Sequence, residues 1–400
     1  MIARLLRWFL FLQLAAVGAL ALALLRPWHS PRSIAAWALA WGASLAIVLL
    51  LRAWITAQNF ALSWHYRSAT PQQHRPRLWG RCRLFFGEFA AIMLASCWTM
   101  AWPKAIGHIV PGATCLPVLL VHGYVCNSGY WTQLGVLLEQ EGISHHAIDL
   151  EPLGAAIDDH AAQLQRAVEA LCARTGSSEA IIVAHSMGGL VVRAYVRVHG
   201  HQRIARVITL GTPHHGTSLA RFGIGSNARQ MRCQGQGSGS DWLTSLAASE
   251  SAAQRALLTS IFSHHDNIVA PQTSCRLPGA KNIEFGGVGH VAMGRDRRIL
   301  QCVLDEIRLV RRTGAAAVAV AAATPGVARV LPSIGVPTQP DIDDLTRRIA
   351  QLSHLVAQLF KPLIQTVAAL KRKRASAKRA ANARFATAAS KAVATKQRRK

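Results

Sequence analysis

Ser186 lies where a serine hydroxyl could be activated as a nucleophile. It is part of "AIIVAHSMGGLVVRAYVRVHG", residues 180–200. The continuous apolar run 180–184 predicts a buried strand, and the apolar spacing of three and four residues after the serine predicts a helix. A serine on such a strand-to-helix turn needs small neighbours, and Ala184 and Gly188 are small. The pattern predicts a nucleophile, although a structural turn serine would give a similar pattern.

Backbone N–H groups near this turn could stabilise the anion that forms during acyl transfer. The apolar run 118–121 predicts a second strand, which ends in His122, Gly123 and Tyr124. A strand that ends in this way positions one N–H group of an oxyanion hole, and the residue after the nucleophile supplies the other. The candidate donors are therefore the backbone N–H groups of Tyr124 and Met187.

An acid and a base that could activate Ser186 lie further along the chain. Asp266 follows a predicted strand in a polar turn, and His290 follows another in a glycine-rich loop. A serine is a weak nucleophile until a base removes its proton, and a histidine base is oriented by a carboxylate. We therefore expect Ser186 as nucleophile, His290 as base and Asp266 as the orienting acid.

Other residues of the same types are weaker candidates for these roles. Asp241 lies in a polar low-complexity loop, and Asp296 follows the predicted base along the chain. His264 and His265 lie too near Asp266 in sequence to be placed easily between it and the serine.

Five sequence signatures in a fixed order give the chain a family resemblance. They are "LLVHGY", "VAHSMGG", "TLGTPHHGT", "SHHDNIVAP" and "GVGHVAM", and they span residues 115–305. Together with the order serine, aspartate, histidine, they resemble the α/β-hydrolase superfamily and, within it, bacterial triacylglycerol lipases and esterases. The resemblance implies an α/β fold with a mostly parallel sheet flanked by helices. It also implies hydrolysis of esters of apolar acyl groups through an acyl-enzyme intermediate, which requires no metal ion or cofactor.

Two alternatives to an ester hydrolase remain open at this point. The chain could be a membrane-associated scaffold or polyanion-binding protein with a degenerate hydrolase domain, or a thioesterase or amidase of the same fold. The complete set of catalytic candidates favours the ester hydrolase. The sequence does not indicate an oligomeric state.

The formal net charge of +26 is concentrated at the two ends of the chain. Residues 1–104 contain 11 Lys and Arg residues and one acid, and residues 371–400 contain 12 and no acid. Residues 105–370 contain 22 against 18, so the predicted catalytic region is nearly balanced. The acid-free tail 371–400 is predicted to be disordered and to contact anionic lipid or nucleic acid.

Three apolar segments near the amino end predict a membrane region, residues 1–104. They cover residues 8–25, 34–51 and 84–102, and the first two are long enough to cross a bilayer. The first segment is also consistent with a cleavable signal peptide. The third contains Glu88 and is also consistent with a buried or interfacial helix, so we expect two or three spans.

The loop between the second and third segments sets the expected orientation. Residues 57–83 contain five arginines and no acid, which predicts a cytoplasmic location for this loop. If the third segment spans, the catalytic domain lies on the periplasmic side of an inner membrane. Export would permit disulfides, and Cys233 with Cys275 is the favoured pair, although buried free thiols are equally consistent with the sequence.

The remaining chain divides by composition into a catalytic domain and three attachments. The domain is expected over residues 105–310, with a lid-like insertion over the acyl pocket near 216–256. An Ala/Pro-rich linker, 311–341, follows. Residues 342–370 then have apolar positions at helical spacing and predict an amphipathic helix before the basic tail.

Overall fold

The computed structural model describes residues 1–25, 33–113, 115–234 and 238–323. The chain divides into two units, residues 1–315 and 316–400, and the description below concerns the first. The predicted amphipathic helix 342–370 and basic tail 371–400 lie outside the described residues.

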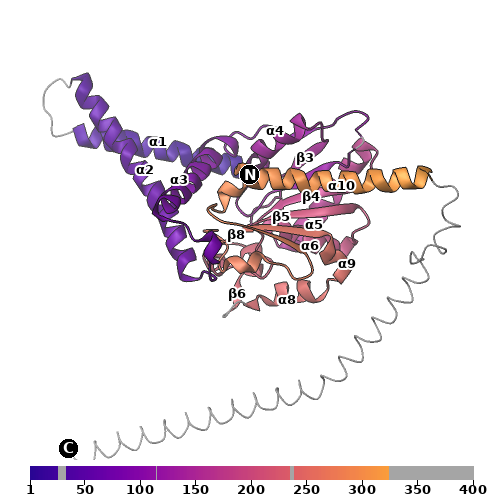
Figure 1. Ribbon diagram of the computed structural model, residues 1–400. Helices are drawn as coiled ribbons and strands as arrows, with labels where there is room; N and C mark the ends of the chain where they lie inside the picture. Colours follow the sequence, from indigo (N-terminus) through magenta and orange to yellow (C-terminus); the bar gives the residue numbers. More distant parts are fainter. Residues whose placement is uncertain (26–32, 114, 235–237, 324–400) are drawn as a thin grey trace, which may run out of the picture. The chain divides into compact units, whose positions relative to one another are not determined.

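A seven-stranded sheet forms the centre of the catalytic domain (Figure 1). Its order is β1-β3-β2-β4-β5-β8-β9, and every neighbouring pair is parallel except β1 with β3. The strands are β1 (Gly107–His108), β2 (Val118–Val121), β3 (His145–Ile148), β4 (Ala180–His185), β5 (Ile204–Leu210), β8 (Leu258–Ser263) and β9 (Lys281–Phe285). The predicted mostly parallel sheet is confirmed.

Helices cover both faces of the sheet because the central strands are apolar on both sides. In β2, Leu119 and Val121 pack with α5 (Ile157–Thr175) and α6 (Met187–His199). Val118 and Leu120 alternate with them and pack against the opposite face, with residues of α4 and α10. These two helices are α4 (Thr132–Gln140) and α10 (Arg297–Ala323). Buried strands of this kind are typical of parallel sheets with helices on both faces.

The predicted insertion near 216–256 consists of short elements between β5 and β8. They are η4 (Ser218–Phe222), α7 (Ser226–Gln230), β6 (Cys233–Gln234), β7 (Ser238–Gly239), α8 (Asp241–Ala248) and α9 (Ala252–Ala256). Three further short helices are η3 (Ser128–Trp131), η5 (Gln272–Cys275) and η6 (Val291–Gly294).

Three helices precede the catalytic domain. They are α1 (Ile2–Leu25), α2 (Ile34–His65) and α3 (Leu78–Leu94), with the short η1 (Gln72–His74) before α3 and the π-helical turn η2 (Ala95–Thr99) after it. Within the described residues, three helical segments are long and apolar enough to cross a membrane: Ile2–Ala23, Ile34–His65 and Leu78–Thr99. The helices α1 and α2 pack against each other through Ala21, Leu25 and Ala40.

The contacts of α3 differ from those of a helix that crosses a bilayer. One stripe of its surface is buried, and this stripe contains Leu84, Glu88 and Ala91. Before α3, the ring of His74 stacks on His264 of the catalytic domain, with centroids 5.0 Å apart. After α3, the backbone of Thr99 lies so close to Gly129 that a Cβ there would not fit. A helix that crossed a bilayer would hold its two ends about 30 Å apart, whereas segments at both ends of α3 contact the α/β domain.

Two further expectations from the sequence concern the cysteines and the segment after residue 310. All eight cysteines are free, so Cys233 and Cys275 do not form the favoured disulfide, and the free-thiol alternative describes them. The helix α10 continues to Ala323, so residues 311–323 of the predicted linker are helical.

Candidate active site

Ser186 lies on the turn between β4 and α6, as the sequence pattern predicts. Its φ of 55° and ψ of −126° are a conformation that residues with a side chain rarely adopt. Two hydrogen bonds hold this strained backbone: the Ser186 N–H donates to the carbonyl of Leu210 at 2.8 Å, and the Thr212 hydroxyl donates to the carbonyl of Ser186 at 2.8 Å. Such strain presents a serine hydroxyl at the top of the sheet, in front of the N-terminus of a helix.

The segment after β2 contacts this turn. A Cβ on Gly123 would lie 2.8 Å from the Cβ of Ser186, so only glycine fits there. The His122 ring fixes the segment, because its Nε2 accepts a hydrogen bond from the Leu150 N–H at 2.9 Å and its Nδ1 lies 2.9 Å from the carbonyl oxygen of Gly123. The two predicted oxyanion donors therefore lie on residues adjacent to this contact, Tyr124 after Gly123 and Met187 after Ser186.

Asp266 and His290 form a buried hydrogen-bonded pair. The Nδ1 of His290 lies 2.7 Å from Oδ2 of Asp266, and His290 and Asp266 are 5% and 1% exposed. The other carboxylate oxygen of Asp266 accepts the N–H groups of Ile268 and Val269 at 2.8 and 2.7 Å. Both oxygens are therefore engaged, which fixes the carboxylate in the orientation that holds the imidazole.

The weaker candidates for these roles have other partners. Asp296 forms an ion pair with Arg298, and Asp241 begins α8. His264 bonds Glu284. The structure thus brings Asp266 together with His290, as predicted from the strand ends.

The electrostatic surroundings of His290 favour its protonated form. Burial by itself would lower the pKa of this imidazole, but the charge of Asp266 and the hydrogen bond to it outweigh that effect, and the charge of Glu88 adds to them. The net result is a pKa above the ordinary histidine value. A base of this kind is better able to hold the proton that it takes from a hydroxyl.

A stack of rings supports His290 from the nucleophile strand. Tyr130 stacks on His185 with centroids 4.2 Å apart, and His185 contacts His290 with centroids 4.6 Å apart. The Nε2 of His185 also lies 3.2 Å from the carbonyl oxygen of His290. His185 precedes Ser186 in the chain, so this stack connects the nucleophile turn with the histidine loop. No pattern in the sequence had indicated this role.

Glu88 of α3 holds the other side of the histidine loop. This fully buried carboxylate accepts the N–H groups of Val291 and Ala292 at 3.0 and 2.9 Å, directly after His290. It also lies against Gly289, where a Cβ would be 2.5 Å from the carboxylate. The sequence predictions missed this role, and the signal that could have found it is that Glu88 is the one acid among residues 1–104.

Ser63 of α2 holds the aspartate turn in a similar way. Its hydroxyl donates a hydrogen bond to the backbone carbonyl of Asp266 at 2.7 Å. The side-chain amide of Gln272 donates to that carbonyl and to the Ser63 hydroxyl, each at 2.9 Å. The predicted membrane region thus contributes contacts to both the acid and the base of the candidate triad. The sequence contains no signal that pairs Ser63 with a residue 203 positions away.

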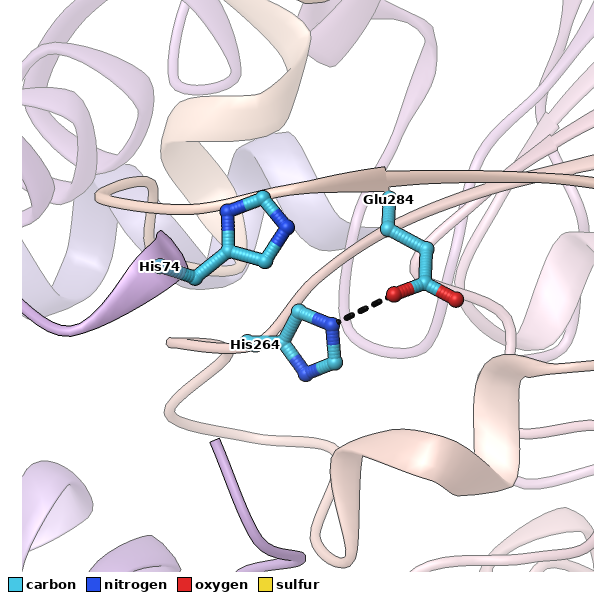
Figure 2. Close-up of side chains that lie close together, drawn as sticks. All are labelled: His74, His264 and Glu284. Atoms are coloured by element: carbon cyan, nitrogen blue, oxygen red, sulfur yellow. Dashed lines mark hydrogen bonds and ion pairs between the residues drawn. The ribbon is translucent and has the colours of Figure 1, made fainter. Parts of the chain in front are cut away.

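Close to this contact, three side chains from separate segments meet (Figure 2). They are His74, His264 and Glu284, whose ligand atoms lie within 4.8 Å of one another, a set that could coordinate a divalent cation. Within this group, Nε2 of His264 lies 2.8 Å from Glu284, His74 stacks on His264, and Arg276 pairs with the same carboxylate, while the buried Nδ1 of His264 has no hydrogen-bond partner among the described residues. Its evident role is to tie the α2–α3 connection to the catalytic domain.

The central part of the chain is similar to known proteins. The sequence profile of the alpha/beta hydrolase fold matches residues 117–291. The triacylglycerol lipase of Burkholderia plantarii is 33% identical over 132 residues, which cover 30% of this chain and 36% of the relative. That of Pseudarthrobacter phenanthrenivorans is 34% identical over 120 residues, which cover 28% and 37%. The chain thus spans about a third of the length of the two curated relatives.

Among solved structures, the mature lipase BlEst2 of Bacillus licheniformis is similar with a TM-score of 0.44 and 18% identity, over 51% of this chain and 97% of the other. Residues 117–291 have the α/β-hydrolase fold, with a mostly parallel sheet flanked by helices. In sequence, the chain is similar to these two triacylglycerol lipases over 30% and 28% of its length.

Proposed function

We propose that the protein is a membrane-anchored serine hydrolase that cleaves carboxylic esters of apolar acyl groups. One observation carries the proposal: a buried Asp266–His290 hydrogen bond in the same domain as a serine on a strained strand-to-helix turn. A serine with a purely structural role in this turn would not require a base nearby. Here the pKa of the candidate base His290 is raised, and its ring contacts His185, the residue next to Ser186. The similarity to triacylglycerol lipases supports the ester as the bond that is cleaved.

The residue types define the catalytic cycle. His290 removes the proton of the Ser186 hydroxyl as its oxygen attacks the acyl carbon, and Asp266 stabilises the imidazolium that results. His290 then gives the proton to the leaving alcohol, which leaves an acyl group on the serine. In the second half of the cycle, a water molecule loses a proton to His290 and attacks the acyl carbon. As the bond from that carbon to the serine oxygen breaks, His290 returns the proton to this oxygen, so that a carboxylic acid is released and the serine is restored.

Backbone N–H groups stabilise the tetrahedral intermediate in this proposal. Those of Tyr124 and Met187 are the donors, and both residues adjoin the Gly123–Ser186 contact. Because backbone donors are fixed before the reaction begins, they do not reorganise as negative charge develops. The N-terminus of α6 behind Ser186 adds its dipole to the same effect.

Exposed apolar side chains beside the oxyanion segment support an apolar substrate. Val125 and Phe222 are 43% and 62% exposed, and Ile224 is 84% exposed. The Tyr124 hydroxyl donates to the carbonyl of Ile224 and accepts its N–H, which ties the insertion to the oxyanion segment. An acyl chain that covered these side chains would remove apolar surface from water.

A fluorophosphonate probe tests the proposal, because it labels only serines that a base activates. We expect labelling of the wild-type chain and none of Ser186→Ala. A wild-type chain that is folded but not labelled would favour the scaffold or polyanion-binding alternative. A labelled chain that cleaves thioesters or amides in preference to oxygen esters would favour the thioesterase or amidase alternative.

For the membrane region, we infer a two-helix hairpin of α1 and α2 with both ends at the catalytic domain. Leu6 of α1 packs against the core under one face of the sheet, and Ser63 near the end of α2 bonds the Asp266 turn. The contacts of α3 with the domain support two spans. In this arrangement the domain lies on the same side as the arginine-rich loop 57–83, and the positive-inside tendency favours the cytoplasmic side over the periplasmic location expected from three spans.

Fusions of green fluorescent protein to each end of the chain test the arrangement, because the protein fluoresces in the cytoplasm and not after export in unfolded form. Two spans predict fluorescence from both fusions. Three spans predict fluorescence from the amino-terminal fusion alone, and that result would restore the periplasmic location.

A further inference from the structure

A cavity of about 800 Å³ lies between α2, the α2–α3 connection, α3 and the turn that carries Asp266. Pockets of roughly 300–1,000 Å³ are typical of small-molecule sites. Of the three triad candidates, Asp266 lines this cavity and Ser186 and His290 do not, so the cavity lies at the acid and away from the serine at which the proposed acyl transfer occurs. No role in the proposed reaction accounts for it.

The cavity has an apolar interior and a basic rim. Phe60, Leu84 and Phe85 are among the apolar side chains that line it, and they are buried or half-buried. Arg67, Arg75 and Arg81 also line it, and all three are exposed. An apolar space with cations at its opening matches an amphiphile that has an apolar chain and an anionic head group.

The three rim arginines lack acidic partners. Within the described part of the chain, no ion pair joins any of them to a carboxylate, and residues 57–83 contain no Asp or Glu. Arg67 lies over the ring of Trp64 at 3.4 Å, and Arg75 donates to the carbonyl of Thr70 at 3.4 Å. Their guanidinium groups therefore keep donors for a phosphate, the anion that arginine recognises best.

The position of the cavity favours a lipid over a soluble ligand. It is lined by the last turns of α2, a helix long and apolar enough to cross a membrane, and by the first turns of α3. Trp64 at this end of α2 and Trp79 at the start of α3 are 58% and 82% exposed. Exposed tryptophans beside arginines are typical of the membrane–water interface, where phospholipid head groups lie.

We propose that this cavity binds an anionic phospholipid of the membrane, with an acyl chain against Phe60, Leu84 and Phe85 and its phosphate on the rim arginines. One wall of the site is the Ser63–Gln272 hydrogen-bond network that holds the backbone of Asp266. Lipid in the cavity therefore stabilises the turn that orients the candidate base. The effect of the lipid on the Asp266 turn, and so on catalysis, rests on the proposed function, whereas the binding of the lipid does not.

Native mass spectrometry of the full-length Ser186→Ala chain in detergent tests the binding, since hydrolysis cannot consume the lipid. We expect phosphatidylglycerol to be retained about tenfold better than phosphatidylcholine, because the choline cation of phosphatidylcholine offsets its phosphate charge, whereas phosphatidylglycerol is a net anion for the rim arginines. Arg75→Gln with Arg81→Gln should abolish this preference. The matched control, Arg77→Gln with Arg83→Gln, removes the same charge from the same segment outside the cavity and should preserve it.

A third variant tests the acyl-chain part of the site. Ala57 lines the cavity, so Ala57→Leu should reduce its volume and weaken lipid retention without a change of charge.

An equal loss of lipid preference in both arginine pairs would overturn the proposal, because it would show general attraction to a basic segment. Retention of oleate without retention of phosphatidylglycerol would overturn the assignment of a phosphate head group.

Turnover of a soluble short-chain ester tests the coupling in the active chain. In phosphatidylcholine nanodiscs, added phosphatidylglycerol should raise kcat severalfold in the wild type and in Arg77→Gln/Arg83→Gln, and should have no effect in Arg75→Gln/Arg81→Gln. Specific retention without a change of kcat would overturn the coupling and leave the site. Absence of any ester turnover would instead reject the proposed function, while the binding result would still stand.

Discussion

The turn that carries Ser186 and the loops that carry Asp266 and His290 are held by different parts of the chain. Ser186 bonds Leu210 and Thr212, which belong to the same α/β domain. The loops of the acid and the base are bonded instead by Ser63 and Glu88, which precede that domain. The candidate nucleophile is thus held by its own domain, whereas the loops of the candidate acid and base are held by α2 and α3.

The amino-terminal helices therefore contribute contacts to the candidate site. Glu88 is fully buried, and its carboxylate bonds two backbone N–H groups beside the candidate base. A charge buried at such a site is costly unless it is satisfied, so the contact with the histidine loop is needed for the stability of α3 on the domain. A fragment cut at residue 105 would lose these contacts.

Among the variants that test whether α2 and α3 position the candidate acid and base, we expect the largest loss of kcat from Glu88→Gln. The amide keeps one acceptor oxygen but turns an N–H donor toward the N–H group of Val291 or Ala292, so the loop of His290 should shift. Misplacement of a catalytic group by about 1 Å can cost ~10²-fold in rate. We expect a loss of this order in kcat on a chromogenic ester, with labelling of Ser186 by the fluorophosphonate slowed but not abolished.

Glu169→Gln is the control for this variant, since Glu169 lies exposed on α5 and makes its hydrogen bond to Gln165 within that helix. It should retain wild-type activity. A wild-type kcat in Glu88→Gln would contradict the claim that α3 positions the loop of His290, and would show that α3 only covers the domain.

The pH profile of the same variant is expected to change in a defined direction. Protonated His290 cannot act as a base, so activity falls as pH decreases through its pKa, which Asp266 and Glu88 raise. The acid limb of kcat/KM should therefore lie above the ordinary histidine pKa in the wild type. Loss of the Glu88 charge should move that limb to lower pH, and a limb that stays in place would contradict an electrostatic role for Glu88.

A smaller effect is expected from Ser63→Ala. The variant removes one of two hydrogen bonds to the Asp266 carbonyl, and Gln272 keeps the other, so a loss of about 1 kcal/mol, or roughly fivefold in kcat/KM, is expected. Ser44→Ala is a matched control, because Ser44 is a buried serine of the same helix that bonds only the backbone of Ala40 in its own turn. Equal losses in the two variants would show a general effect on α2.

The smallest effect is expected from deletion of the basic tail 371–400. None of the candidate catalytic residues lies there, so turnover of a soluble ester should stay within about twofold of the wild type. Co-sedimentation with anionic vesicles at low salt should decrease, because basic residues near an anionic surface contribute to binding. A large loss of soluble-ester turnover would show that the tail contributes to the catalytic domain.

The α/β domain was predictable because its signals are local. The elbow of Ser186 requires a strand, small neighbours and a helix within a few residues, and each leaves a pattern in the sequence. Asp266 and His290 could be chosen because each follows a predicted strand, and the ends of parallel strands lie at one edge of a sheet. Local patterns alone were thus sufficient to predict the fold class and the types of residue available for catalysis.

The way in which the amino-terminal helices meet this domain depends on tertiary contacts. The apolar segment of α3 has the composition of a membrane span, and only its contacts show that one stripe packs on the histidine loop. Glu88 and Val291 are 203 positions apart, and no local pattern predicts that their side-chain and backbone groups will pair. Hydropathy measures whether a helix can leave water, but it does not distinguish lipid from protein as the surface that covers the helix.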